Sequence, residues 1–256
     1  LRGGHVVLVE PARGGPRPLV DTGGKTSGHA VPKPPLMAQG VNRLPRLALT
    51  HGDIRHVGGA DVVLRRFPPA EIVVPAPEFR SPAWRAALAA AEARGVPARW
   101  VAAGDAAGAW RVRHPPAVPR AARADDASLV LTGEVDGLRL ALVADLSRAG
   151  EEVWLAAGTV PPADVLVTGV AEGRALSPAL LRALHPRLIV VADAAQPATA
   201  RAPAEARADF AAAGAPVIFL SDAGAVRLRW RGGTLHVEDA RGREVRTGGG
   251  PVAPLP

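Results

Sequence analysis

The residues whose types and spacing best suit chemistry lie between positions 51 and 56, within the stretch Leu47–Gly59 (LALTHGDIRHVGG). An apolar run ends there in His51, Asp53, Arg55 and His56, and a Gly–Gly pair follows. Two imidazoles and a carboxylate close together at the end of a strand are typical ligands of zinc or manganese. Because the chain has no cysteine, a metal would have to be held by His, Asp or Glu. The stretch therefore predicts a metal site at a strand end.

The composition limits the functions that this site could serve. The 256 residues carry a formal charge of +7, and a basic domain attracts polyanions such as nucleic acids. A GC-rich genome, which favours Ala, Arg, Gly and Pro, explains the same composition, and no Lys/Arg block is present. The charge alone therefore leaves DNA binding open. The lack of cysteine excludes disulfides and thiol catalysis.

Hydropathy predicts no membrane-spanning segment, because no run of ~18 uninterrupted apolar residues occurs. No charged segment followed by an apolar one marks a signal peptide. The chain begins at Leu1 rather than Met, from which we expect a domain or fragment of a longer protein.

The elements that must position the site follow from apolar periodicity and turn residues. We predict strands over residues 5–10, 19–21, 46–50, 71–75, 98–101, 110–114, 128–133, 138–145, 165–167, 188–193, 217–220, 224–230 and 234–238. We predict helices over residues 57–67, 82–94, 178–184 and 203–213, and a loop over 27–35. Asp136–Gly137 predicts a tight hairpin between the strands at 128–133 and 138–145.

The order of these elements predicts an α/β fold in two similar halves. Each half contains a β-hairpin and a βαβ unit, so each forms a mixed sheet with helices on its outer face, and the two sheets stack as an αββα sandwich. No repeat or linker divides the chain. We expect one domain over residues 1–246 and a disordered Gly/Pro-rich tail over 247–256.

Several short motifs occur in an order that is more specific than any one of them. They are Gly4–Leu8, Leu19–Gly23, Leu49–Gly59, Asp125–Leu131, Leu138–Leu146, Ala163–Val167, Ser177–Leu188 and the closing segment 211–228. In order and spacing they resemble the C-terminal metallo-β-lactamase domain of ComEC-type DNA-internalisation competence proteins. The resemblance covers most of the chain and implies the αββα metallo-β-lactamase-like sandwich.

The resemblance also implies a cellular setting. In that family the domain follows the membrane channel portion of the same protein, so we expect a parent protein in the bacterial cell membrane. The domain itself would lie on the outer, extracytoplasmic side. DNA, single- or double-stranded, is the expected partner, and the family role is hydrolysis of incoming DNA during transformation. No small-molecule cofactor is expected.

The family's metal site, carried over position by position, implies four ligands here. His51 and His56 match histidine ligands, and Asp145 matches the aspartate that bridges two metals. Asp53 stands where a second histidine is usual, and a carboxylate changes the preferred metal without abolishing binding. Asp53 and Asp145 are also the expected catalytic carboxylates.

The chain departs from the family pattern at three places. Arg55 stands where the aspartate of the second metal belongs, and a guanidinium neither ligates nor loses its charge. The later turns that bear histidines in the family correspond to residues 168–173 and 198–203, which contain none. We therefore expect a degenerate site that binds one divalent metal, zinc or manganese, or none, and we leave catalysis open.

Two other functions remain open. Arg55 and Arg201 would place fixed positive charge where metals once held a phosphate, so the domain could bind DNA without cutting it. Alternatively, the chain is a stand-alone single-metal hydrolase of esters or lactams.

A purely structural interpretation also remains for these residues. In it the loop at 51–56 is hydrogen-bonded to itself, and Arg55 forms a salt bridge with Asp145 or Asp53. Asp21 would order its loop, and an Asx-type turn would explain Asp125, Asp126 and Ser128. His5 and His29 belong to no pattern and receive no role.

Overall fold

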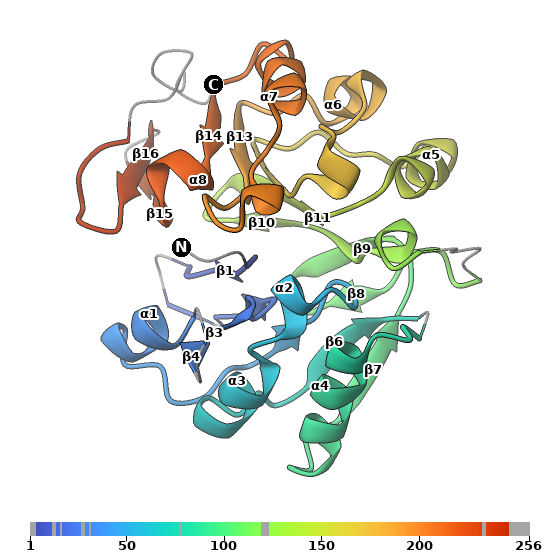
Figure 1. Cartoon of the computed structure of the whole chain (residues 1–256), viewed down its shortest axis with the longest axis vertical. Coiled ribbons are helices and arrows are strands. Elements are labelled where there is room, and N and C mark those ends of the chain that lie inside the picture. Colours follow the sequence, from blue (N-terminus) through green and yellow to red (C-terminus); the bar gives the residue numbers. More distant parts are fainter. Residues whose placement is uncertain are drawn as a thin grey trace.

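The computed structural model describes residues 4–11, 14–15, 17–26, 29–30, 32–76, 78–118, 123–231 and 234–245. These residues form two large sheets that lie one above the other in Figure 1. The first sheet has the order β1 (Val7–Leu8), β2 (Leu19–Val20), β5 (Leu47–Ala48), β6 (Ile72–Pro75) and β7 (Ala98–Val101). The second has the order β14 (Val217–Phe219), β13 (Leu188–Val191), β12 (Val165–Thr168), β11 (Leu138–Ala144), β10 (Val130–Val135), β9 (Trp110–His114) and β8 (Ala106–Ala107).

Both sheets are mixed, as predicted. In the first, β1 and β2 form an antiparallel hairpin, and β2, β5, β6 and β7 run parallel. In the second, β11 to β14 are parallel and β8 to β11 antiparallel. The hairpin between β10 and β11 turns at Asp136–Gly137, where both residues have positive φ (51° and 85°), as a type I′ turn requires.

Helices cover the two outer faces (Figure 1). On the side of the first sheet lie α1 (Lys33–Ala38), α2 (Ile54–Val57), α3 (Ala60–Arg66) and α4 (Pro82–Glu92). On the side of the second lie α5 (Arg148–Ala156), α6 (Pro178–Leu184) and α7 (Ala204–Ala211). A short helix α8 (Leu220–Ala223) follows β14, the hairpin β15 (Val226–Arg231) and β16 (Thr234–Asp239) comes last, and β3 (Lys25–Thr26) pairs with β4 (His29–Ala30).

Three hydrophobic clusters correspond to the three interfaces of a four-layer sandwich. Successive strand residues point to opposite faces, and the packing follows that rule: Leu47 of β5 faces the first helical layer, and Ala48 faces the other sheet. In β12, Val165 faces the first sheet and Leu166 faces the second helical layer. The αββα prediction is confirmed.

Several predicted elements differ from the structure. The helix predicted over 57–67 is two helices, because the chain turns at Gly58–Gly59 between α2 and α3. The loop predicted over 27–35 contains β4 and the start of α1, which begins with a proline-rich turn. Helix α5 and strand β8 were not predicted. The tail predicted over 247–256 lies outside the described residues.

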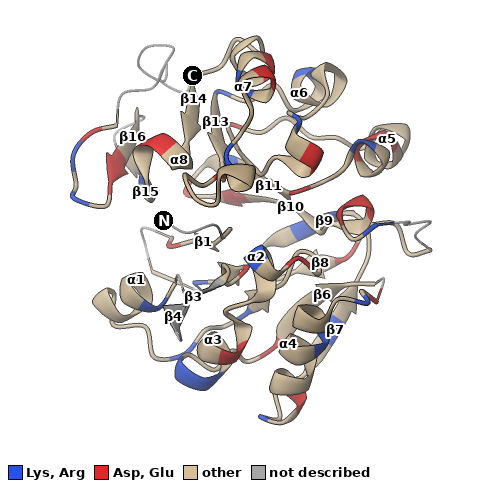
Figure 2. Cartoon of the chain, in the orientation of Figure 1, with Lys and Arg blue, Asp and Glu red and all other residues tan. Residues whose placement is uncertain are grey.

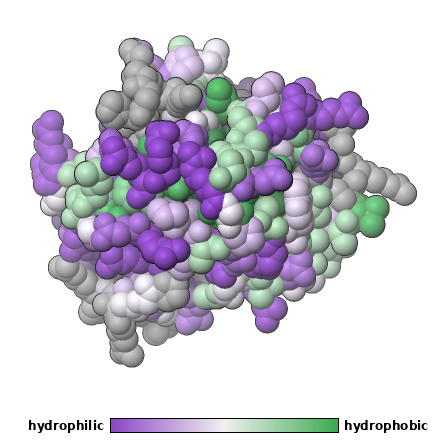
Figure 3. All heavy atoms as spheres, turned by 90° about the horizontal axis from the view of Figure 1, so that it is seen from below, coloured by the Kyte–Doolittle hydropathy of each residue, from purple (hydrophilic) through white to green (hydrophobic). Residues whose placement is uncertain are grey.

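The surface shows mixed character on the faces that the views present. Acidic and basic residues are interspersed over both halves in Figure 2. The lower face in Figure 3 has small apolar areas separated by hydrophilic atoms, as on the surface of many soluble domains. No helix among the described residues is both long enough and apolar enough to cross a membrane.

Candidate metal and phosphate site

The predicted site residues come from strand ends of both sheets. His51 lies three residues after the end of β5, and Asp145 directly follows β11 in the other sheet. Asp21, which was not predicted as a site residue, directly follows β2. His56 lies in α2, which begins just after His51. A hydrogen bond of 3.3 Å joins His56 Nε2 to Asp145 Oδ2. The structure thus brings His51, His56 and Asp145 together, as the sequence predicted.

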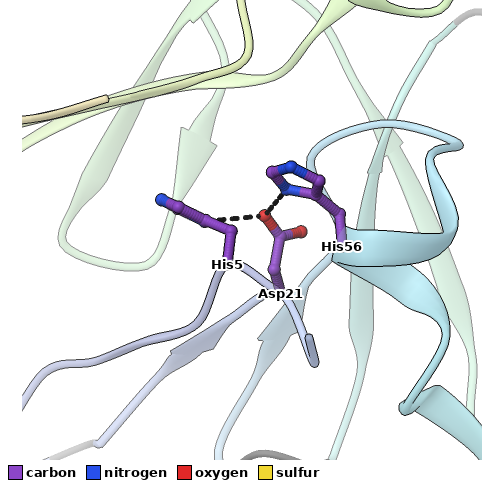
Figure 4. A group of neighbouring side chains, drawn as sticks. All are labelled: His5, Asp21 and His56. Atoms are coloured by element: carbon purple, nitrogen blue, oxygen red, sulfur yellow. Dashed lines mark hydrogen bonds and ion pairs between the residues drawn. The ribbon is translucent and has the colours of Figure 1, made fainter. Parts of the chain in front are cut away.

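Asp21 is the centre of the buried part of the site (Figure 4). Its Oδ2 lies 2.7 Å from His56 Nδ1 and 3.1 Å from His5 Nδ1, and it accepts a hydrogen bond of 2.8 Å from the Thr50 hydroxyl. Its Oδ1 accepts 2.8 Å from the Thr50 backbone N–H. The Asp21 carboxylate therefore holds the start of the loop at 50–56 and orients two imidazoles, while the prediction that it orders its own adjacent loop stays a prediction.

The three imidazoles are buried side by side, with His5 stacked on His56 and His51 tilted by 53° against it. The rings of His5 and His56 have centroids 5.1 Å apart, and those of His51 and His56 are 4.1 Å apart. His51 Nδ1 lies 3.1 Å from Thr50 Oγ1. Its Nε2 is buried and has no hydrogen-bond partner within the described part of the chain. The Nε2 of His5 is likewise buried without such a partner.

The two central histidines, His51 and His56, differ in charge because their pKa values are shifted in opposite directions. Burial lowers the pKa of His51, and the neighbouring His56 lowers it further, to about 3. Burial opposes protonation of His56 too, but the carboxylates of Asp145 and Asp21 raise its pKa to about 10. Burial also works against ionisation of both carboxylates, yet His56 holds the pKa of each well below its usual range. Without a metal, His56 is therefore an imidazolium between two carboxylates.

Local backbone geometry directs Asp145 into the site. The residue before it, Ala144, has φ 52°, a left-handed conformation that costs a residue with a side chain of order 1–3 kcal/mol. The pairing of β11 with β12 shifts register at the same point. Across from it, a Cβ added to Gly169 would collide with Asp145 Oδ1. The missing side chain at 169 therefore makes room for the carboxylate.

Arg55 and Asp53 lie at the mouth of the site. Asp53 Oδ1 accepts a hydrogen bond of 2.7 Å from Arg55 N and so caps α2. The Arg55 guanidinium reaches both carboxylates, with Nε 3.4 Å from Asp53 Oδ1 and Nη2 3.5 Å from Asp145 Oδ2. The predicted salt bridges of Arg55 are therefore confirmed. The roles of Asp53 as ligand and as catalytic group stay predictions.

Arg201 meets Arg55 at a small cavity. Both line it with Asp145, and the remaining wall is formed by Val170, Gly173, Ala192, Thr199 and Ala200. Its volume is about 30 Å³, room for about two water molecules. Arg201 Nη2 also lies 3.0 Å from Asp222 Oδ1. The two turns that lack histidine thus border this cavity with small side chains and one arginine.

The donor atoms fit one divalent cation. Ligand atoms of His51, His56 and Asp145 all lie within 4.8 Å of one another, and the unpartnered His51 Nε2 is one of the buried donors there. Nitrogen and carboxylate donors suit zinc or manganese. A second group, His5, Asp21 and His56, meets the same distance limit, but Asp21 already accepts hydrogen bonds from Thr50 and the imidazoles.

Two residues near the candidate metal ligands were not predicted from the sequence. His5 precedes a two-residue strand, and no spacing rule links it to position 21 or 56. Asp125 was interpreted as part of an Asx-type turn. Its neighbour Asp126 accepts from Arg123 N at 2.9 Å, three residues before it, whereas an Asx turn bonds an N–H two residues after the aspartate. Asp125 Oδ1 instead lies 3.6 Å from His51 Nε2. Burial and the charges of Asp145 and Asp53 raise the pKa of Asp125 to about 6.

Fold and site together describe a two-sheet sandwich whose candidate metal ligands lie where the edges of the two sheets meet. The sequence profile of the metallo-beta-lactamase superfamily matches residues 1–192, and the chain belongs to that superfamily.

One curated relative is the ComE operon protein 3 of Bacillus subtilis (strain 168), which is 31% identical over 171 residues. The match covers 60% of this chain and 22% of that protein. The chain therefore spans about a fifth of the length of this relative.

Solved structures show weaker likeness. A diphosphatase of the PhnP family has a TM-score of 0.43 at 13% identity, with 73% of this chain and 72% of that chain covered. The metallo-β-lactamase SMB-1 bound to 2-mercaptoethanesulfonate also gives 0.43 at 13% identity, covering 65% and 73%. The Bacillus subtilis metallo-β-lactamase fold protein YhfI gives 0.39 at 8% identity, covering 73% and 85%.

Proposed function

We propose that this chain is the metallo-β-lactamase-fold domain of a ComEC-like DNA-uptake protein and that it binds the DNA backbone at the cavity between Arg55 and Arg201. The order of its motifs and its identity to ComE operon protein 3 support the family part. The parent protein would supply a membrane channel, with this domain on the extracytoplasmic side and DNA as its partner.

The observation that carries the DNA-binding part is the convergence of two arginines on one cavity. The side chain of Arg55 is 41% exposed and that of Arg201 52%, so both are accessible to a phosphate. Guanidinium groups bind phosphate oxygens through paired hydrogen bonds. The cavity is too small for a base, which favours contact with backbone phosphates rather than readout of sequence.

Fluorescence anisotropy of labelled single- and double-stranded DNA at several salt concentrations tests this proposal. We expect the affinity to fall with salt. Arg55→Ala and Arg201→Ala should each weaken binding on all sequences and reduce the salt slope by about one. Arg65→Ala is the matched control, because Arg65 lies on α3 and pairs with Asp61 there.

If the wild-type chain shows no salt-dependent affinity, or if Arg65→Ala weakens binding as much as the other two variants, the DNA-binding site is wrong. The family assignment of the domain would stand in either case.

A second candidate function is single-metal hydrolysis of a phosphodiester or ester, favoured by the grouping of His51, His56 and Asp145. A divalent cation held there would polarise a phosphoryl oxygen and supply a nucleophile at neutral pH. The protein's own contribution would be to orient the imidazoles through Asp21 and to hold a substrate phosphate through Arg55 and Arg201.

Cleavage of DNA by the purified chain in zinc or manganese, and its loss in His51→Ala, would support hydrolysis. DNA binding without cleavage in either metal would leave the domain as a non-catalytic module.

A further inference from the structure

The carboxylate of Asp125 lies in an unusual position beside the metal ligands. It is in a 3-10 turn (Asp125–Ala127) before β10, and its Oδ1 is 3.6 Å from His51 Nε2. That distance is too long for a hydrogen bond. His51 is fully buried, and its Nε2 has no hydrogen-bond partner in the described ranges. An acceptor and a nitrogen therefore face each other without being joined.

The hydrogen bonds of Thr50 determine which ring nitrogen of His51 carries the proton. The Thr50 hydroxyl donates to Asp21 Oδ2, because an ionised carboxylate can only accept. Its oxygen is then left to accept, and His51 Nδ1 at 3.1 Å is the donor. The neutral His51 ring consequently has its lone pair on Nε2, which points toward Asp125. The lone pair of His51 Nε2 therefore faces the carboxylate of Asp125, and a positively charged ion between the two would satisfy both.

Two distances at this point match those between neighbouring ligands of one ion, although Asp125 would have to move closer to His56 and Asp145 to share that ion with them. Zinc bonds of 2.0–2.2 Å in a tetrahedral arrangement place neighbouring ligand atoms about 3.3–3.6 Å apart. His51 Nε2 and Asp125 Oδ1 are 3.6 Å apart, and His56 Nε2 and Asp145 Oδ2 are 3.3 Å apart. The second imidazole is held by Asp21 at Nδ1, as ligating histidines usually are.

Asp125 also fits the role better than the other nearby carboxylate. Asp53 Oδ1 already caps α2 and contacts Arg55 Nε. Neither Asp53 nor Asp125 belongs to the group of His51, His56 and Asp145 whose ligand atoms all lie within 4.8 Å of one another. Asp125 Oδ1 is instead directed at His51 Nε2, the donor that lacks a partner.

We propose that Asp125 is a metal ligand that completes, with His51, His56 and Asp145, a site of two nitrogen and two carboxylate donors for a single divalent cation. The proposal rests on the single-metal candidate function and replaces Asp53 by Asp125 in the ligand set. Two carboxylates balance the charge of one divalent ion, and Arg55 would leave Asp145 Oδ2 to join Arg201 at the cavity.

Titration of the chelator-treated 256-residue chain with Co²⁺, followed by visible absorption, tests the ligand set without any reaction. The wild-type protein should give the intense bands of a four-coordinate cobalt site, and Zn²⁺ should displace them. Asp125→Asn should lower the affinity by more than about 100-fold, since loss of an outer partner of a ligand already costs 10–100-fold.

Two further variants separate ligation from other effects. Asp53→Asn should keep its Co²⁺ affinity within a few-fold, because asparagine also caps a helix. Asp125→His should recover much of the affinity lost in Asp125→Asn, because imidazole ligates and a merely structural carboxylate would not be replaced by it. X-ray absorption of the wild-type zinc form should show four nitrogen or oxygen neighbours together with the outer-shell scattering of two imidazoles, and this measurement does not depend on the folding of any variant.

The proposal is overturned if the wild-type chain binds neither Co²⁺ nor Zn²⁺, or if Asp125→Asn binds as the wild type does. It is also overturned if Asp53→Asn, and not Asp125→Asn, loses the metal. Because no DNA is present, failure of DNA binding leaves these results unaffected. Conversely, Asp125→Asn in chelator should bind DNA as the wild type does.

Discussion

The site has two sides, one supplied by the first sheet and one by the second. They differ in where their polar groups find hydrogen-bond and ion-pair partners. On the first side, Asp21, Thr50 and the imidazoles are at most 3% exposed and bond to one another. On the second side, Asp145 meets Arg55 across a small cavity whose other walls are glycine, alanine, valine, threonine and Arg201.

This difference indicates that residues of the first side maintain the fold, whereas residues of the second side could bind a ligand or take part in chemistry. The first side is a buried network in which one carboxylate serves several donors, so its members stabilise the loop at 50–56, and the Nε2 atoms of His51 and His5 are left without a partner among the described residues. The second side has exposed charge and open space, and its groups would gain most from a phosphate or a cation.

The largest effect should follow from removing the central carboxylate of the first side. Asp21→Asn leaves the His56 imidazolium without one of its two counter-charges in a fully buried position. Breaking a buried pair from one side costs about 3–5 kcal/mol. We expect a loss of that size in the free energy of unfolding, measured by urea denaturation of the metal-free protein.

Asp61→Asn is the control for this substitution. Asp61 is half exposed and pairs with Arg65 and Arg94 on the helical surface, where ion pairs contribute about 0–1 kcal/mol. A loss of less than about 1 kcal/mol for Asp21→Asn would mean that the first side does not stabilise the fold as its hydrogen bonds suggest.

Much of the fold could be predicted because periodicity is local. Runs such as 71–75 and 188–191 alternate between two buried faces, and the Asp136–Gly137 turn determines its own hairpin. Helix α5 was missed because Ser147, which caps it, follows the site residue Asp145 closely and the apolar spacing is short. The break at Gly58–Gly59 was missed because the apolar pattern continues across it.

The site was predictable only where its residues are close in sequence. Four of its predicted residues lie within six consecutive positions, namely His51, Asp53, Arg55 and His56. The fifth, Asp145, lies at a strand end. His5 and Asp125 approach the site through tertiary packing, since β1 pairs beside β2 and the turn before β10 packs against the loop after β5. A backbone bond from Leu129 N to Thr50 O joins the latter two segments. No local pattern records such a contact.

A smaller effect should come from filling space on the second side. Gly169→Ala places a Cβ on Asp145 Oδ1, so the carboxylate must move away from His56 and Arg55. Added bulk in a packed position costs about 1–3 kcal/mol. We expect a loss in that range by urea denaturation, together with weaker Co²⁺ binding, because Asp145 is a proposed ligand.

A double-mutant cycle isolates the cause. In the Asp145→Ala background the collision is absent, and Gly169→Ala should then cost less than about 0.5 kcal/mol. If Gly169→Ala costs the same in both backgrounds, position 169 does not act through Asp145, and the second side is more tightly constrained than its cavity implies.

The smallest expected effect is a change of stability with pH, counted per pH unit. It arises at His56, where the two sides of the site meet. In the metal-free protein its pKa is raised to about 10, against 6.5 for a free imidazole. The folded state therefore holds a proton that the unfolded state has lost. The stabilisation is fully present below about pH 6.5 and declines as pH rises toward 10.

Between pH 7 and 9 the other shifted groups of the site do not titrate. The pKa of His51 is lowered to about 3, that of Asp125 is raised only to about 6, and Asp21 and Asp145 ionise at lower pH still. The free energy of unfolding in chelator should thus fall by up to about 1.4 kcal/mol per pH unit in this window. His185→Gln, at an exposed helix end, should keep this slope. Nitrogen-15 NMR of the histidines should show His56 doubly protonated at pH 8, and a neutral ring there, with flat stability, would mean that the carboxylates of the two sides do not share one imidazolium.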